Sequence, residues 1–195
     1  MDNLQCVVIS PQFCVSNQVK LSVVKKPIAV TDGNFVVTDD KGNIKLKVEE
    51  KLLSIHGRHI LLDFDENNPP IVTIKKKILS AHKRWQVFKG DSADLLFSAK
   101  KSSIIQFRTE LDVFSASNHE ESCWDFKVIG SWFERSCVIY NKDSAPIAHM
   151  HKKHTIGSTL LGKDTFDVNV YPNVDYAFIV ALVVILYEIN QDKDD

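Results

Sequence analysis

Residues 176–187 form an unbroken apolar run, Tyr-Ala-Phe-Ile-Val-Ala-Leu-Val-Val-Ile-Leu-Tyr, bounded by Asp175 and Glu188. A helix that is apolar on every side must be buried on every side. The run is shorter than the ~20 residues that a membrane-spanning helix needs, and Asn173 and Asp175 precede it as candidate N-caps. We therefore expect a helix in the middle of the fold. A buried central strand and a membrane-inserted tail anchor stay open as alternatives.

The chain before this run has the pattern of β-strands. Apolar and polar residues alternate in stretches such as 44–48 and 166–170, which places the apolar side chains on one face of a sheet. Polar turn clusters follow strand positions that are spaced 25 or 26 residues apart. These positions are Val36, Leu61, Val87, Val113 and Val138. The repeat of strand, polar turn and strand predicts five successive hairpins in one antiparallel sheet.

Five hairpins supply ten strands, and we expect one more strand near residues 20–30 and another at 165–171. Twelve strands exceed what an open twisted sheet usually carries. The expected fold class is therefore mainly β, an antiparallel closed barrel of about twelve strands around a central hydrophobic C-terminal helix. A two-sheet sandwich is the alternative. We expect residues 1–195 to form one domain, with residues 1–15 and 190–195 as flexible tails.

Charge is distributed unevenly along the chain, although the formal net charge is only -1. Residues 75–108 carry nine Lys and Arg side chains and two acids, whereas residues 109–126 carry five acids and neither Lys nor Arg. Two adjacent hairpins would then present a basic stripe that attracts anionic headgroups. A solvated sheet edge rich in lysine is the structural alternative. The candidate lipid- or anion-binding residues are Lys75, Lys77, Arg84, Lys100 and Lys101.

Several stretches of the chain resemble the plant LURP-one-related family. They are residues 31–35, 82–88, 111–114, 130–135, 151–155, 161–164 and 171–178, the last reading Tyr-Pro-Asn-Val-Asp-Tyr-Ala-Phe. The likeness covers about residues 6–190. It implies a tubby-like fold, which is a twelve-stranded barrel around a central C-terminal helix. The family is related in fold to tubby proteins, which bind phosphoinositides and can act as membrane-tethered transcription regulators, and to phospholipid scramblases. One plant member is linked to pathogen defence.

Other motifs are incomplete. Residues 157–164 nearly spell a P-loop, but Asp164 replaces the hydroxyl residue and a strand-like run follows where a helix should begin. Residues 63–67 imitate the start of a calcium loop without its later ligands. His149, His151 and His154 could share a metal, although no nearby carboxylate orients their rings. We interpret these as turns and surface histidines, and we predict no metal, cofactor or catalytic residue.

The resulting prediction is a non-enzymatic binding protein that acts in signalling or plant defence and binds phosphoinositide or anionic lipid through the basic hairpins. A phosphorylated partner is the other expected ligand, and we expect neither sequence-specific nucleic-acid binding nor a transmembrane span. A scramblase-like membrane-associated protein, or a small-molecule carrier with a site beside the central helix, is the alternative. With no signal sequence and no cysteine motif, we expect an intracellular monomer located in the cytoplasm, at a membrane surface or in the nucleus.

Overall fold

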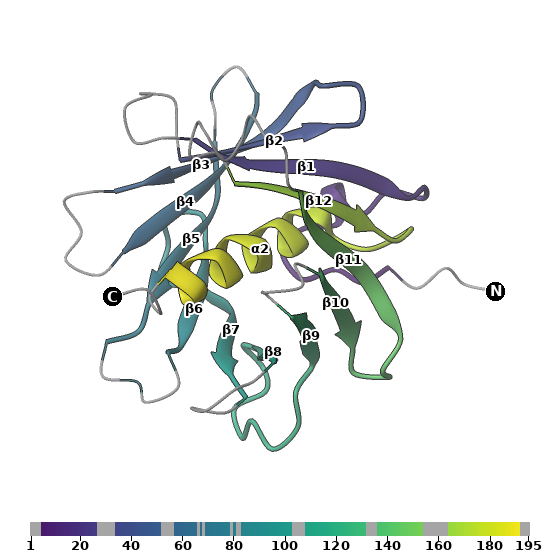
Figure 1. The fold of residues 1–195 in the computed structure, drawn as a ribbon. Helices are drawn as coiled ribbons and strands as arrows, with labels where there is room; N and C mark the ends of the chain where they lie inside the picture. Colours follow the sequence, from purple (N-terminus) through teal and green to yellow (C-terminus); the bar gives the residue numbers. More distant parts are fainter. Residues whose placement is uncertain are drawn as a thin grey trace.

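The computed structural model describes residues 5–26, 34–51, 57–65, 67, 69–78, 80, 83–102, 108–131, 136–153 and 164–191. They form a closed antiparallel barrel that surrounds a long C-terminal helix (Figure 1). The predicted fold class, a mainly β barrel with the apolar run as its central helix, is confirmed.

Twelve strands make the wall and one α-helix occupies the middle. The strands are β1 (Val19–Lys25), β2 (Phe35–Asp39), β3 (Ile44–Glu50), β4 (Arg58–Asp63), β5 (Pro70–Lys76), β6 (Trp85–Lys89), β7 (Leu95–Lys101), β8 (Thr109–Ser115), β9 (Phe126–Ser131), β10 (Ser136–Asn141), β11 (Pro146–Lys153) and β12 (Thr165–Val170). A short 3-10 helix, η1 (Pro11–Phe13), precedes them, and the central helix is α2 (Tyr176–Gln191).

Neighbours in sequence are neighbours in the wall. Each strand pairs antiparallel with the next one along the chain, and β1 pairs with β12 to close the barrel. The five positions spaced 25 or 26 residues apart fall in the first strands of successive hairpins, namely β2, β4, β6, β8 and β10. The predicted repeat is therefore the hairpin repeat of the barrel, and closure leaves no free sheet edge.

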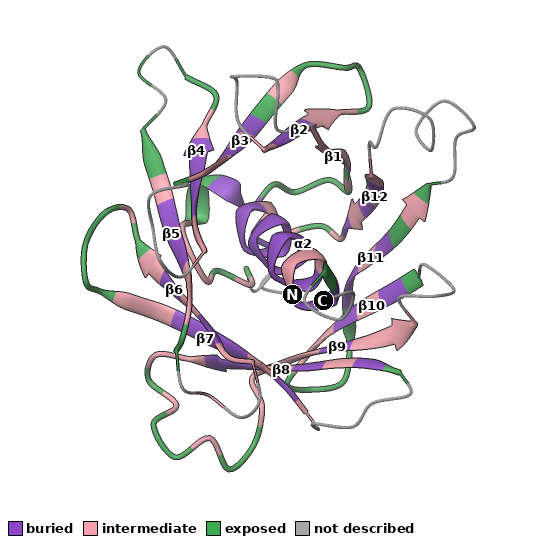
Figure 2. Ribbon diagram, turned by 60° about the vertical axis from the view of Figure 1, so that its left-hand side comes forward, coloured by how far each residue is buried: buried purple, intermediate pink, exposed green. Residues whose placement is uncertain are grey.

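Alternation along the strands fills the interior around α2. In β3, Leu46 and Val48 are fully buried, whereas Lys45 and Lys47, on the opposite face, are more exposed. The helix residues from Ala177 to Leu186 are at most 1% exposed. Figure 2 shows the buried helix enclosed by strands on all sides. The wall thus supplies the all-round burial that a helix without a polar face requires.

A buried carboxylate fixes the start of the helix. One oxygen of Asp175, Oδ1, accepts the backbone N–H of Phe178 at 3.1 Å, as an N-cap does. The other oxygen, Oδ2, accepts the N–H groups of Val8, Ile9 and Ser10 at 3.3, 2.7 and 3.0 Å. The four bonds satisfy a side chain that is 0% exposed, since a buried charge is tolerated only when it is well hydrogen-bonded.

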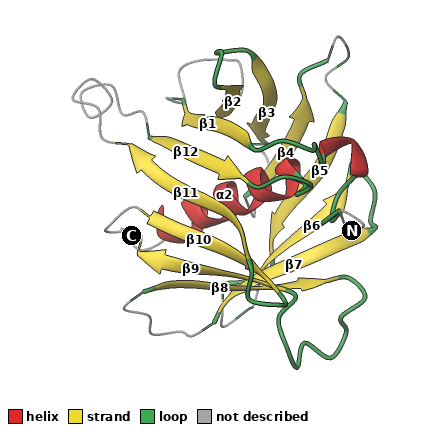
Figure 3. Cartoon of the chain, turned by 90° about the vertical axis from the view of Figure 1, so that its right-hand side faces the viewer, coloured by secondary structure: helices red, strands yellow, loops and turns green. Residues whose placement is uncertain are grey.

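The N-terminal segment lies at the same end of the barrel (Figures 1 and 3). The N–H of Cys6 donates to the carbonyl oxygen of Asn173 at 2.8 Å. Phe13 is 2% exposed, and its ring meets that of Tyr176 edge to face at 5.3 Å between centroids. Part of the expected N-terminal tail, residues 6–14, is therefore attached to the barrel and the helix. Burial, with a smaller effect of Asp175, raises the pKa of the Cys6 thiol to about 11.

The opposite end of the barrel, where α2 finishes, carries inward-facing lysines. Each occupies the last or nearly last position of its strand and pairs across the sheet with a buried apolar residue. The pairs are Lys25 with Phe35, Lys76 with Trp85, Lys101 with Leu111 and Lys152 with Phe166. Cations here lie near the C-terminal end of the helix, where its carbonyl groups carry partial negative charge.

His59 lies among these lysines. It is fully buried in β4, with its Nε2 3.6 Å from Oε1 of Glu188 and its ring 5.9 Å from that of Trp85. Within the described part of the chain, neither ring nitrogen has a hydrogen-bond partner. Burial, and to a smaller extent the charge of Lys25, lowers the pKa of His59 from 6.5 to about 4, so the ring is neutral at physiological pH.

Replacement of Leu182 or Val183 by Asp is expected to prevent folding. Both side chains are 0% exposed, and an unpaired carboxylate there costs several kcal/mol, which is comparable with the stability of a whole domain. Ile78→Asp, which places the same charge on a residue that is 53% exposed, is the control and should fold. Circular dichroism and solubility measure the outcome, and a soluble Leu182→Asp protein with unchanged melting would contradict burial of the helix.

The free energy of unfolding is expected to fall as the pH drops from 6.5 to 4. In that window the unfolded chain protonates His59 while the folded chain keeps it neutral, so the stability present above pH 6.5 is lost on acidification, by up to roughly 3 kcal/mol. Urea unfolding at a series of pH values measures this loss. His59→Phe should flatten the curve, whereas His151→Gln, on an exposed outer residue, should not. Equal slopes for all three proteins would show that His59 takes no part.

Candidate functional site

Alternation along β7 separates two of the predicted basic residues. Lys101 pairs with the buried Leu111 and is 9% exposed, so it faces the barrel interior. Lys100 pairs with Asp112 and faces outward, with its Nζ 4.5 Å from the centre of the Phe114 ring. The two lysines are adjacent in the sequence and lie on opposite sides of the wall, because successive side chains of a strand point to opposite faces. The structure therefore places Lys101 apart from the other candidates.

The other candidates lie on the outer face, together with one arginine that the sequence analysis missed. Lys75 is the cross-strand partner of Arg58 in β4 and of Gln86 in β6. The N–H of Lys77 donates to the carbonyl oxygen of Arg84 at 2.8 Å, which places these two residues side by side. Arg58 stands outside every basic cluster in the sequence, and only the strand register could have identified it.

Lys75 and Lys77 line a half-open basic pocket of about 500 Å³. The pocket is defined by Gly57, Arg58, Lys75, Lys76, Lys77, Ile78, Gln86 and Phe88. Its lining includes three cationic residues of the outer face, one amide and two apolar side chains, whereas Lys76 faces the barrel interior. None of these eight lining residues is acidic, so the pocket is suited to an anion.

Neighbouring side chains position the cations of the basic pocket. The Nζ of Lys75 lies 4.8 Å from the centre of the Phe88 ring, which favours a cation over its face. Arg58 forms an ion pair of 3.2 Å with Asp91, whose side chain is 62% exposed. Such an exposed pair contributes about 1 kcal/mol at most, and an incoming phosphate could replace it. Within the described residues, Lys75 and Lys77 have no acidic partner.

Ile78 lies at the edge of the basic pocket. It is 53% exposed, a higher value than for Val7, Val15 and Phe64, the other large exposed apolar residues among those described. It directly follows Lys77 and lies two residues beyond the end of β5 at Lys76. An exposed apolar side chain beside several cations is the combination by which a protein enters the headgroup region of an anionic bilayer.

Arg84 and Lys100 both contact the carboxylate of Glu121. Nη1 and Nη2 of Arg84 each donate to one carboxylate oxygen of Glu121, the second at 2.6 Å. Lys100 Nζ lies 2.7 Å from Oε2 of the same carboxylate, and Arg84 also donates to Ser98 Oγ at 3.1 Å. Hydrogen bonding to Arg84, together with the Lys100 contact, lowers the pKa of Glu121 from 4.5 to about 2. The predicted basic stripe is therefore neutralised in part.

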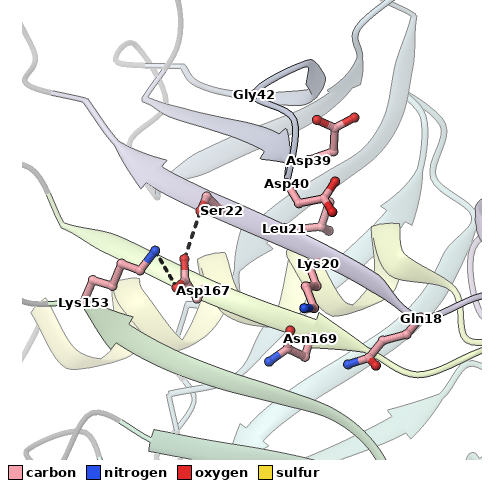
Figure 4. Close-up of a pocket in the computed structure, with 10 residues that line it drawn as sticks. All are labelled: Gln18, Lys20, Leu21, Ser22, Asp39, Asp40, Gly42, Lys153, Asp167 and Asn169. Carbon is pink, nitrogen blue, oxygen red and sulfur yellow. Dashed lines mark hydrogen bonds and ion pairs between the residues drawn. The ribbon is translucent and has the colours of Figure 1, made fainter.

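A second, polar pocket of about 750 Å³ lies on the outer face of β1 and β12 (Figure 4). Two of its three acids already have partners. Asp167 accepts a hydrogen bond from Ser22 at 2.9 Å and forms an ion pair of 2.7 Å with Lys153. Asp39 accepts the backbone N–H of Asn43 at 2.8 Å. The other two charged residues that line it, Lys20 and Asp40, have opposite signs, so the polar pocket offers a ligand less net charge than the basic pocket does.

The described residues of the remaining sequence motifs do not form a metal site. His149 and His151 do share the outer face of β11, and Nε2 of His149 lies 2.9 Å from the Tyr171 hydroxyl. No group of three or more His, Cys, Asp and Glu side chains near enough to hold a metal occurs in the described part of the chain. His154, residues 157–163 of the P-loop-like run and Asn68 of the calcium-like turn lie outside the described residues.

A cavity that touches α2 is very small. It has a volume of about 10 Å³ and is lined by residues that include Lys101, Thr109, Leu186 and Asn190. That is room for about one water molecule, so it offers no site for a carried small molecule. In the described chain, no helix has both the length and the apolar character needed to cross a bilayer.

Comparison with known proteins identifies the family. The model of the LURP-one-related family matches residues 19–187. The chain belongs to the LURP-one-related family. Among its relatives in Arabidopsis thaliana are Protein LURP-one-related 15, which is 49% identical over 95% of this chain and 87% of that protein, and Protein LURP1, which is 46% identical over 95% and 91%. The resemblance inferred from the sequence is thereby confirmed.

The fold of this LURP-one-related protein is also found in a solved structure. An X-ray structure of an Arabidopsis thaliana protein superposes with a TM-score of 0.72 at 41% sequence identity, covering 94% of this chain and 98% of that one. The match extends over nearly the whole of both chains, so the two proteins share the barrel and its helix.

Glu121→Gln is expected to make this protein less sensitive to acid below pH 5. Because the pKa of Glu121 is lowered to about 2 in the folded state, its stabilising contribution is complete above pH 4.5 and is lost as the pH falls towards 2. The wild-type free energy of unfolding should decline more steeply than that of the variant across this window. Urea titrations from pH 5 to 2 measure both, and parallel curves would show that the Arg84–Glu121–Lys100 contact contributes nothing to stability.

Proposed function

We propose that this LURP-one-related protein is a non-enzymatic module that binds the phosphorylated headgroup of an anionic lipid in the basic pocket. The observation that carries the proposal is the meeting of Arg58, Lys75 and Lys77 around a pocket with no acidic lining residue. Lysine and arginine both suit phosphate, the first as a point charge and the second as a fork of donors.

The position of Ile78 favours a lipid as the source of the headgroup. A soluble phosphate ligand gains nothing from an exposed apolar side chain beside its site. A bilayer does, because Ile78 can insert among the acyl chains while the cations contact the headgroups. The proposed docking therefore brings the end of the barrel near the C-terminus of α2 to the membrane. Signalling or plant defence, which the family resemblance implies, would be the setting of this docking.

The chemistry of the basic pocket supports binding without catalysis. Its described lining contains lysine, arginine, glutamine and apolar side chains, and neither a carboxylate nor a histidine that could act as a general base. Its cations are suited to holding charge in place. This is the basis on which we propose a binding protein and not an enzyme.

Lys75→Gln/Lys77→Gln is expected to weaken binding to phosphoinositide-containing vesicles by roughly thirtyfold, because each lysine near an anionic surface contributes about 1 kcal/mol. Co-sedimentation with phosphatidylcholine vesicles, with and without a phosphatidylinositol bisphosphate, measures the effect. Wild-type binding should also weaken as salt is added. The matched control is Lys41→Gln/Lys142→Gln, which removes two exposed lysines from turns at the other end of the barrel. Equal pelleting of the two double variants would refute the proposed site.

Ile78→Ser separates a membrane from a soluble ligand in the same assay. This variant should bind vesicles more weakly and bind the free inositol phosphate headgroup as well as wild type does, because only the bilayer contacts the isoleucine. If both affinities are unchanged, the ligand is a phosphate group that need not belong to a lipid, as on a phosphorylated partner protein. If wild type binds neither vesicles nor free headgroup, the proposed function is wrong.

A further inference from the structure

The connection between β8 and β9, residues 116–125, folds back over the outer face of the barrel. It starts beside the beginning of β7, where the N–H of Ala116 donates to the carbonyl oxygen of Leu96 at 2.8 Å. Glu121, five residues later, contacts Lys100 near the other end of β7. The segment thus runs along β7 from the beginning of that strand towards its end, and we call residues 116–125 the flap.

Side-chain hydrogen bonds hold the flap in this shape. Asn118 donates to the carbonyl oxygen of Cys123 at 2.8 Å and accepts the N–H of Glu121 at 3.1 Å. Asp125 accepts the N–H of Ser115 at 2.7 Å. Glu121 itself has a φ of 50°, in the left-handed region that is unfavourable for a residue with a side chain. The flap therefore adopts a strained backbone at the residue that contacts the cations.

The groups that contact the Glu121 carboxylate form an anion site. Arg84 offers two parallel donors, and Lys100 offers an ammonium at 2.7 Å. The Ser98 hydroxyl lies 3.1 Å from Nη1 of Arg84. A guanidinium fork combined with an ammonium and a hydroxyl is the set of groups that recognises a phosphate monoester as readily as a carboxylate. Side-chain exposures of 18% for Arg84 and 25% for Lys100 show that both are partly shielded from water.

This site adjoins the basic pocket. Lys77 is bonded through its backbone to Arg84, and Arg84 and Lys100 are bridged by one carboxylate. Outward side chains that are opposite one another on neighbouring strands lie about 5 Å apart. Lys77, just after β5, Arg84, just before β6, and Lys100 in β7 therefore form one row. Lys77 belongs to the basic pocket, and the other two contact Glu121.

We propose that Arg84, Lys100 and Ser98 form a second phosphate site, that Glu121 is its internal ligand, and that a headgroup with two or more phosphates displaces Glu121 from it. This inference rests on the proposed function, in which the first phosphate lies in the basic pocket. A phosphate monoester presents more charge and more acceptor oxygens than a carboxylate, and the strain at Glu121 is relieved when the flap is released. Glu121 then makes the protein select multiply phosphorylated headgroups, because a single phosphate in the first site leaves the flap in place.

Glu121→Gln is expected to bind a soluble inositol trisphosphate about tenfold more tightly than wild type. The reason is that the phosphate no longer competes with a carboxylate for the charge-assisted hydrogen bonds of Arg84 and Lys100. Inositol monophosphate should bind both proteins equally. The matched control is Glu120→Gln, which makes the same change of charge at the exposed neighbouring residue. Isothermal titration calorimetry on the full chain gives the affinities, and Arg84→Gln added to Glu121→Gln should abolish the gain. Equal trisphosphate affinities for the Glu120 and Glu121 variants would overturn the inference.

Two further measurements keep the test decisive. In wild type, inositol trisphosphate should speed hydrogen exchange of the flap amides, including that of Glu121, and unchanged or slower exchange would overturn displacement even if the variant folds poorly. With inorganic pyrophosphate as probe, Glu121→Gln should still gain affinity in the Lys75→Gln/Lys77→Gln background. If the two lysine changes alone leave vesicle binding intact, the basic pocket is not the first site. A gain in pyrophosphate affinity from Glu121→Gln in that same background would still support the second site.

Discussion

The helix without a polar face determines the rest of this structure. Ten consecutive residues of α2, from Ala177 to Leu186, are at most 1% exposed, and no open sheet could cover them on every side. A closed wall of twelve strands does so, and the helix in turn fills an interior that the wall could not fill with its own side chains. Helix and barrel are therefore each a condition for the other, so the fold should form cooperatively.

The sequence revealed the architecture because its two periodicities are strong. Hairpins recur every 25 or 26 residues, and one apolar segment is too short for a membrane and too hydrophobic for a surface. The start of the helix was also accessible, since Asp175 is a typical N-cap. Its second role, in holding the N-terminal segment, was not, because bonds to Val8 and Ile9 join residues more than 160 positions apart.

The candidate site was predicted less well, and the reason is geometric. Counting charges along the chain cannot tell which side of the wall a lysine faces. Lys100 and Lys101 were counted together, yet Lys100 lies on the outer face beside Glu121, and Lys101 faces the interior near the end of α2. Arg58 was missed because its proximity to Lys75 depends on strand register. Part of the basic character of this sequence therefore complements the helix terminus and has no need of a ligand.

The N-cap of α2 links the two ends of the chain. Asp175 lies at the base of the helix with its charge fully buried, and three of its four hydrogen-bond donors come from Val8, Ile9 and Ser10. A protease or an alternative start site that removed these residues would leave the buried carboxylate with one of its four hydrogen bonds. The loss of folding free energy would then be much larger than the few deleted contacts suggest. Residues 8–10 are thus a structural component of the barrel, and truncations that remove them act on the core.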